Sequence, residues 1–318
     1  MLIVQKFGGS SLAGAERLRR AASIIADSAD AGNKVVAVVS ARGDMTDELL
    51  GQARRISADA PARELDALLS CGETGSAAMT AMQLADMGKS CVSLTGAQAG
   101  ILTDSVHGAA RILSIDTARI MRELDAGKIV VAAGFQGAER GGDTTTLGRG
   151  GSDTTAVELA AALKADRCEI YSDVDGIYTA DPRLVTGAVR LDSIDYGDML
   201  HLALHGSQVL HSRSVEAAMR ANVRVHLLSS FTRREGTVMC KLDDRSGLCG
   251  VTRDPSLGTV SIIGREADAH VLAEAVAALA HSDIIVTRTE LFDGGCSLLV
   301  SPDRLLPALE ITHRRFFR

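Results

Sequence analysis

The sequence predicts an α/β fold with a mostly parallel sheet, followed by a small α+β module. Up to about residue 230, short runs rich in Val and Ile alternate with helical patterns. Such runs are typical of parallel strands that helices cover on both faces. A polar, turn-rich stretch follows between residues 232 and 247, and beyond it the apolar segments follow the order βαββα.

The first predicted strand covers residues 2–6 and leads into a loop at 8–12. A helix is expected over 15–29, because Leu18, Ala21 and Ile25 fall on one helical face. The other strands of the sheet are expected at residues 34–40, 90–94, 128–133, 167–172 and 223–228. Polar loops follow several strand ends, and ligands of open α/β sheets bind at that edge.

The C-terminal module is expected to be smaller and to differ in composition. Its predicted strands cover residues 259–263, 283–288 and 296–300, and its predicted helices cover 267–281 and 303–316. We therefore expect a first domain over residues 1–235, a linker over 236–247 and a small module over 248–318.

Composition excludes several classes of protein. The 318 residues carry a formal net charge of −6, which disfavours nucleic acid as a partner. No apolar run approaches the length of a membrane span, and the N-terminus lacks the pattern of a signal peptide. The six cysteines contain no CxxC pair, so we expect free thiols, no structural metal site and a cytoplasmic location.

Residues 145–155 (Thr-Thr-Leu-Gly-Arg-Gly-Gly-Ser-Asp-Thr-Thr) are unusually polar and rich in glycine. Arg149 offers a fork of donors that suits a carboxylate or phosphate, and Asp153 offers the opposite charge. A helix is expected over 156–163, so that its free N–H groups open onto this loop. The segment predicts a site for a small zwitterion; the alternative is an ordinary glycine-rich connection.

Two further segments have comparable character. Residues 6–11 (Lys-Phe-Gly-Gly-Ser-Ser) place a cation and two glycines at a strand end, as an anion-binding loop requires, although a surface turn has the same pattern. Residues 171–183 contain Asp173, Asp175 and Asp181, with Tyr178 and Arg183 able to flank a base or phosphate. This run lacks the ligands of an EF-hand, so its alternative is a solvated acidic turn.

These segments, in this order, resemble the amino-acid kinase superfamily and, within it, the aspartate kinases. The resemblance covers residues 1 to about 235 and rests on six ordered motifs. They lie at residues 4–12 (Val-Gln-Lys-Phe-Gly-Gly-Ser-Ser-Leu), 38–50, 71–76 (Cys-Gly-Glu-Thr-Gly-Ser), 134–137 (Gly-Phe-Gln-Gly), 147–153 and 171–183.

The resemblance implies a three-layer αβα fold and ATP-dependent phosphorylation of the β-carboxylate of L-aspartate, which yields 4-phospho-L-aspartate for the synthesis of lysine, threonine and methionine. It implies ATP and nucleotide-borne Mg²⁺ as cofactors, and Lys6 and Asp153 as catalytic residues. The implied nucleotide contacts are Lys6, Gly8, Gly9, Ser10, Ser172, Asp173, Tyr178, Asp181, Arg183 and Gln208. The implied amino-acid contacts are Ser40, Thr46, Glu73, Arg149, Gly150, Gly151, Ser152 and Asp153.

The chemistry of these residues agrees with the implied reaction. Arg149 suits the α-carboxylate, while Glu73 and Asp153 suit the ammonium group. The β-carboxylate is already ionised at neutral pH, so the nucleophile needs no general base. Alternatively, Glu73 caps the helix that follows, and Ser40 and Thr46 are turn hydroxyls.

Histidines at 201, 205 and 211 share an apolar helical region. The first two have the spacing of metal ligands, but ordinary packing or surface histidines are the preferred interpretation, because no third ligand is in view.

Three features depart from the family pattern. Gln208 stands where the family usually has a lysine that reaches ATP, so a charge-assisted contact is lost. Arg42 stands where related kinases commonly have Met, close to Ser40 and Thr46, so we expect this added cation to affect the choice of acceptor. Residues 248–318 resemble only one ACT module, without its final strand, and residues 264–268 (Gly-Arg-Glu-Ala-Asp) replace a turn of the effector pocket.

These departures predict slower turnover or weaker ATP binding, little feedback by lysine or threonine, and a homodimer formed through the open sheet edge of the tail. Two alternatives remain. One is a paralogue that phosphorylates a modified aspartate-like amino acid, and the other is a non-catalytic subunit that pairs with a full-length kinase.

Overall fold

The computed structural model describes residues 1–232 and 234–317. The chain forms two compact units: unit 1 comprises Met1–Asp175 and Arg220–Glu235, and unit 2 comprises Gly176–Met219 and Gly236–Arg318. Residues 176–219 therefore pack with the C-terminal part of the chain, although they precede residue 235 in the sequence. The functional domain boundary expected at residue 235 stays a prediction.

Unit 1 contains parallel strands in the order β11-β9-β1-β2-β6-β3. All six were expected from the apolar runs, with bounds that differ by no more than two residues. They are β1 (Leu2–Phe7), β2 (Lys34–Val39), β3 (Cys91–Leu94), β6 (Ile129–Ala133), β9 (Arg167–Ser172) and β11 (Val225–Ser229). The predicted parallel sheet is confirmed.

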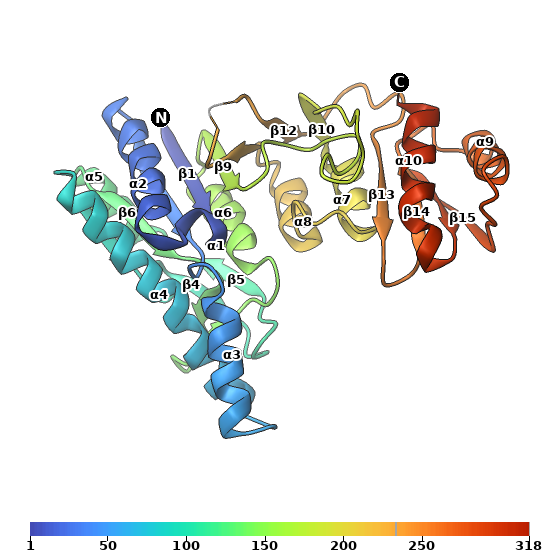
Figure 1. The fold of residues 1–318 in the computed structure, drawn as a ribbon. Coiled ribbons are helices and arrows are strands. Elements are labelled where there is room, and N and C mark those ends of the chain that lie inside the picture. Colours follow the sequence, from blue (N-terminus) through green and yellow to red (C-terminus); the bar gives the residue numbers. More distant parts are fainter. Residues whose placement is uncertain (233, 318) are drawn as a thin grey trace. The chain divides into compact units, whose positions relative to one another are not determined.

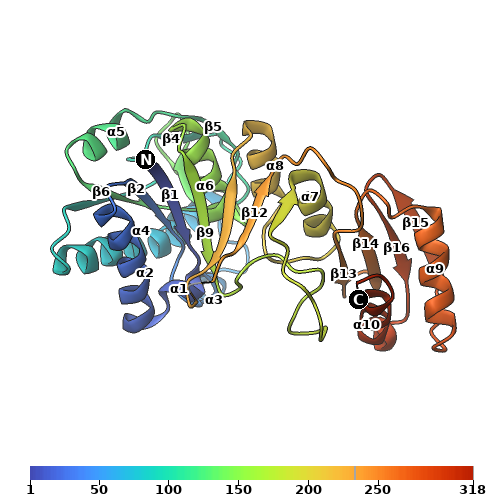
Figure 2. The ribbon, with the colours of Figure 1, turned by 90° about the horizontal axis from the view of Figure 1, so that it is seen from above.

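Helices lie on both faces of this sheet (Figures 1 and 2). One face carries α2 (Gly14–Asp30) and α4 (Ala62–Asp86), and the other carries α6 (Gly151–Ala162). Leu18, Ala21 and Ile25 of α2 are buried in the core, together with Phe7 of β1. Neighbouring residues of a strand point to opposite faces, so Lys6 points toward α6. The shorter helices are α1 (Gly9–Leu12), α3 (Met45–Ile56) and α5 (Ala118–Asp125).

A second, small sheet of unit 1 has the strand order β5-β4-β7-β8 and was not predicted. Its strands have three or four residues each and lack the apolar runs that identified the main sheet. They are β4 (Ile101–Thr103), β5 (Ile112–Ile115), β7 (Gln136–Ala138) and β8 (Thr144–Thr146).

Two local expectations in unit 1 were wrong. The loop expected at residues 8–12 contains the short helix α1, and the helix expected to begin at residue 156 begins at Gly151. Gly150 adopts the left-handed conformation (φ 70°) just before that first turn. The Thr154 and Thr155 hydroxyls donate to the carbonyls of Gly150 and Gly151, so these polar residues are accommodated within the helix.

Unit 2 contains the small α+β module, which has one strand more than expected. Its antiparallel sheet has the order β13-β14-β16-β15. The elements of unit 2 are β10 (Ser193–Asp195), α7 (Tyr196–Leu204), most of α8 (Ser212–Ala221), β12 (Thr237–Cys240), β13 (Gly250–Asp254), β14 (Thr259–Ile263), α9 (Ala269–Ala280), β15 (Arg288–Phe292), β16 (Gly295–Leu299), η1 (Pro302–Arg304) and α10 (Leu305–Phe316). Strand β12 thus occupies part of the stretch expected to be a linker.

The strand expected at residues 283–288 was wrong. Asp283 has a positive φ of 55°, which turns the chain after α9, and Ile284 is buried in the core. The β15–β16 hairpin pairs Phe292 with Gly295, and this register places the strand at residues 288–292.

His201 and His205 pack against an aromatic ring, as the preferred interpretation expected. The ring of His205 stacks on that of Phe292, with centroids 4.2 Å apart and planes 8° apart. His205 Nδ1 also lies 2.8 Å from the His201 carbonyl oxygen. Within residues 1–232 and 234–317, no helix combines the length and the apolar character that crossing a membrane requires.

Candidate functional site

A hollow of about 760 Å³ in unit 1 is lined by Lys6 and by every residue that the resemblance assigned to binding of the amino-acid substrate. Lys6 and Ser40 lie at the carboxyl ends of the neighbouring strands β1 and β2, where the sheet topology predicted a ligand. The predicted residues along its wall are Lys6, Ser40, Thr46, Glu73, Arg149, Gly150, Gly151, Ser152 and Asp153.

An ion pair joins the two residues predicted to be catalytic. Lys6 Nζ lies 2.5 Å from Asp153 Oδ1, and the side chains are only 11% and 14% exposed. Lys6 comes from the centre of the sheet and Asp153 from the first turn of α6. This pair fixes a positive charge beside a helix N-terminus, where an anionic ligand is favoured.

The glycines after Lys6 allow the backbone to pack closely. A Cβ on Gly9 would lie 2.6 Å from the carbonyl oxygen of Ala41, so no larger side chain fits there without a shift. The Gly9 carbonyl also accepts a hydrogen bond from Gly43 N, at 3.0 Å. Gly8 has space around it, because a Cβ there would lie 3.6 Å from Lys6 Nζ. Ser10 is exposed.

Glu73 is a buried carboxyl group at the wall of the hollow. It is 3% exposed and lies within the 25-residue helix α4, so the alternative that it caps a following helix is wrong. Its Oε1 accepts a hydrogen bond from Ala41 N at 3.1 Å, and its Oε2 has no partner among the described residues. Burial raises the pKa of Glu73 to about 7. The neighbouring Gly72 permits this contact, since a Cβ there would lie 2.8 Å from Ala41 Cβ.

Ser40 and Thr46 are half-buried at the end of β2 and the start of α3, and both line the hollow. Arg42, which the sequence places between them, is half-buried but is not among the lining residues. An effect of Arg42 on the choice of acceptor stays a prediction.

The glycine-rich segment before α6 holds an exposed arginine between two left-handed glycines. Arg149 lies between Gly148 (φ 75°) and Gly150 (φ 70°), and residues other than glycine rarely adopt such positive φ values. Gly151 is required for another reason, because a Cβ there would lie 2.9 Å from Cδ2 of Phe135.

Phe135 itself has a φ of 68°, which is rare for a bulky residue and costs free energy. Hydrogen bonds hold it in place: its N–H donates to the Thr155 hydroxyl, and its carbonyl accepts from Leu147 N.

Sequence reasoning missed Asp66, a second buried carboxyl group of the hollow. It is fully buried and accepts hydrogen bonds from the Thr146 hydroxyl at 2.5 Å and from Gly108 N at 3.0 Å. His107 Nδ1 lies 2.8 Å from its Oδ2. Asp66 precedes Glu73 by seven residues, which places both on one face of α4. That spacing was the signal that could have found it.

The residues assigned to the nucleotide are divided between the units. Ser172 ends β9 in unit 1 and Asp173 follows it; the Ser172 carbonyl accepts from Ser230 N, and Asp173 is exposed. In unit 2, Arg183 binds Asp181 with two parallel hydrogen bonds of 3.0 and 2.8 Å and lowers the pKa of that carboxyl group. Tyr178 pairs with Arg190 in an isolated β-bridge, and Gln208 is exposed.

Because these residues belong to two different units, a nucleotide site formed by both groups stays a prediction. Among the described residues, no group of three or more His, Cys, Asp and Glu side chains has an arrangement that holds a metal ion.

Comparison with known proteins identifies relatives that match most of this chain. Residues 1–229 match the amino acid kinase family. The aspartokinase of Mycolicibacterium smegmatis is 47% identical over 290 residues, which are 89% of this chain and 69% of that protein. The solved aspartate kinase from Synechocystis is 36% identical with a TM-score of 0.69, and the match covers 99% of this chain and 55% of that one.

A third relative is E. coli aspartokinase III, solved in complex with aspartate and ADP. It is 26% identical with a TM-score of 0.72, and the match covers 95% of this chain and 79% of that one. The family match covers residues 1–229, which include every segment that forms the hollow, and the first relative matches 89% of the chain. The chain therefore belongs to the amino acid kinase family and, within it, to the aspartokinases.

Proposed function

We propose that this chain transfers the γ-phosphoryl group of ATP to the β-carboxylate of L-aspartate and forms 4-phospho-L-aspartate. The observation that carries the proposal is the hollow in which the Lys6–Asp153 pair, Glu73 and Arg149 meet at the carboxyl end of the sheet. The similarity to aspartokinases supports the same activity, and one of these relatives was solved with aspartate and ADP.

The charges of the hollow orient the substrate. Arg149 binds the α-carboxylate, while Glu73 and Asp153 bind the ammonium group. This orientation directs the β-carboxylate toward Lys6. Since that carboxylate is ionised at neutral pH, the protein needs to align it and neutralise charge rather than remove a proton.

The loop after β1 fits a nucleotide phosphate. Gly8 lies beside the Lys6 ammonium group, since a Cβ there would lie 3.6 Å from Nζ. Because glycine has no side chain, that space is open to a phosphate. Lys6, Gly8, Gly9 and Ser10 would hold the phosphates, and Ser172, Asp173, Tyr178, Asp181, Arg183 and Gln208 would contact the rest of the nucleotide. ATP supplies the phosphoryl group, and Mg²⁺ carried by its phosphates offsets their negative charge.

We also propose that the protein works in the cytoplasm. All six cysteines are free thiols. Free thiols persist in a reducing compartment, which supports this location.

Replacing Lys6 tests its catalytic role. Lys6→Met should lower kcat by about a hundred-fold or more, because it removes a fixed positive charge from the transferring phosphoryl group. Trapping of the acyl phosphate with hydroxylamine measures the rate. The control Lys34→Met removes an exposed lysine that pairs with Asp125, and it should retain normal activity. Equal rates for the two variants would exclude a catalytic role for Lys6.

The raised pKa of Glu73 predicts a pH dependence of substrate binding. Below about pH 7 the carboxyl group of the free protein is neutral and binds an ammonium group weakly, and above it the carboxylate is charged. We expect kcat/KM for aspartate to rise as the pH is raised through 7. Glu73→Gln should raise KM for aspartate about ten-fold and remove this rise. A pH profile that is unchanged in the variant would contradict the assignment.

Restoring the family's lysine at position 208 tests the nucleotide assignment. Gln208→Lys adds a charge-assisted hydrogen bond, so KM for ATP should fall several-fold while KM for aspartate stays constant. Gln52→Lys, which makes the same substitution at another exposed position, is the matched control. An unchanged KM for ATP in Gln208→Lys would remove Gln208 from the site.

The tail predicts weak feedback and self-association. The segment at residues 264–268 departs from the effector-pocket turn of related kinases, so millimolar lysine and threonine, singly or together, should change the rate by less than about two-fold. Strong inhibition would contradict this proposal.

Residues 288–291 of the edge strand β15 are exposed, and such an edge favours pairing with a second copy. A monomer by light scattering would contradict self-association.

A further inference from the structure

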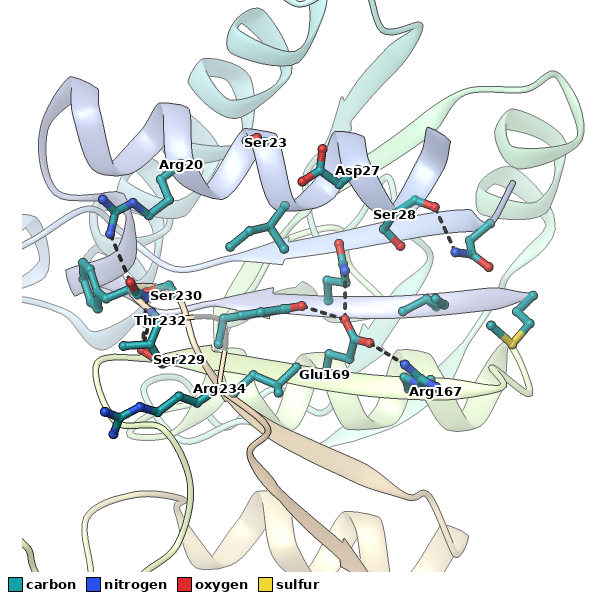
Figure 3. A pocket seen from close by; sticks show the side chains of 18 residues that line it. Arg20, Ser23, Asp27, Ser28, Arg167, Glu169, Ser229, Ser230, Thr232 and Arg234 are labelled. Atoms are coloured by element: carbon teal, nitrogen blue, oxygen red, sulfur yellow. Dashed lines mark hydrogen bonds and ion pairs between the residues drawn. The ribbon is translucent and has the colours of Figure 1, made fainter. Parts of the chain in front are cut away.

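Unit 1 has a second hollow of about 720 Å³, on the face of the sheet opposite the Lys6–Asp153 pair. Gln5 and Lys6 are neighbours in β1, so their side chains point to opposite faces. Lys6 lines the first hollow and Gln5 lines the second. The floor of the second hollow consists of β1, β9 and the end of β11, and its walls are α2, residues 229–232 and Arg234 (Figure 3).

The floor is polar although it lies in the middle of a sheet. Gln5 is 2% exposed and Glu169 is 6% exposed. Gln5 Nε2 donates to Glu169 Oε2 at 2.9 Å, and the Tyr171 hydroxyl donates to the same oxygen at 3.0 Å. Arg167 Nη1 lies 3.4 Å from Glu169 Oε1. This network accounts for the burial of the Glu169 carboxylate.

The network leaves one buried polar atom unexplained. Gln5 Oε1 has no hydrogen-bond partner within the described chain. A buried acceptor without a donor costs free energy, and proteins seldom retain one without a reason. Burial raises the pKa of Tyr171, so its hydroxyl stays neutral, and its proton is already donated to Glu169. The free hydrogen-bonding capacity at this part of the floor therefore belongs to acceptors, which require donors from a ligand.

One end of the hollow has the opposite character. Figure 3 shows Glu169 near the middle of the floor, with Arg20 of α2 and Arg234 toward the same end, on opposite sides of Ser229, Ser230 and Thr232. Arg20 is exposed and makes a long contact of 3.5 Å with the carbonyl of Phe231. Arg234 is 74% exposed and lies 3.4 Å from Asp175. Both guanidinium groups keep donors that can bind an anion.

The strand register gives the separation of the two ends. Glu169 is paired with His226, and Ser229 lies three residue pairs further along β11. Three strand residues span about 10 Å. Figure 3 shows Ser229 toward the end where Arg20 and Arg234 lie, so about 10 Å, the length of a small extended molecule, separates the acceptors of the floor from that end.

We propose that the second hollow binds a small zwitterion whose ammonium group contacts Gln5 Oε1 and Glu169 and whose carboxylate contacts Arg20 and Arg234. The ligand class is an amino acid in which several carbon atoms separate the amine from the acid. This site is distinct from the aspartate site and does not depend on the proposed kinase activity.

Calorimetric titration of the full chain with 6-aminohexanoate tests the proposal. We expect one binding site that saturating aspartate does not block. Hexylamine and hexanoate, which each carry one of the two charges, should bind about ten-fold more weakly, since each loses one set of charge-assisted hydrogen bonds. No binding, displacement by aspartate, or equal binding of all three probes would overturn the proposal.

Variants at both ends locate the binding. Arg20→Ala and Arg234→Ala change exposed side chains and should each weaken binding of 6-aminohexanoate several-fold. Gln5→Met removes the buried acceptor and should weaken it similarly. Arg19→Ala is the matched control, because Arg19 is exposed on α2 but does not line the hollow. The arginine variants decide the outcome if Gln5→Met fails to fold, and affinities equal to the control would place the probe elsewhere.

Discussion

The ion pair between Lys6 and Asp153 is the interaction on which the site depends. It connects the central strand of the sheet to the first turn of α6, and both partners are largely buried. A buried charge is tolerated only with a partner, so each residue requires the other while no ligand is present. A bound phosphate and a bound ammonium group would each supply a new partner. Under the proposed function, substrates would replace the internal pair without leaving either charge uncompensated.

Close backbone packing keeps this pair in position. Gly9 of α1 and Gly72 of α4 both lie against residue 41, with no room for a Cβ at either position. Phe135 is held in a strained conformation between α6 and the loop before it. Because the folded chain already holds these residues in position, substrate binding loses less conformational entropy.

The sequence predicted much of this arrangement because its signals were local. Continuous Val and Ile runs identified all six parallel strands, and charged residues among glycines identified Lys6, Arg149 and Asp153. Contacts between distant segments were not predictable. The burial of Asp66 depends on Thr146 and Gly108, and the second hollow depends on which part of a sheet face lacks a helix. The start of α6 was missed because its first turn is polar, and polarity there usually indicates a loop.

The path of the chain between the two units has a consequence for synthesis. The chain leaves unit 1 after Asp175, returns for residues 220–235 and then leaves it again. On the ribosome, the edge strand β11 therefore emerges after residues 176–219 of unit 2. Unit 1 cannot complete its sheet before that segment of unit 2 has been synthesised. A fragment that ends near residue 235 would contain residues 176–219 without the segments that cover them, and would expose apolar surface.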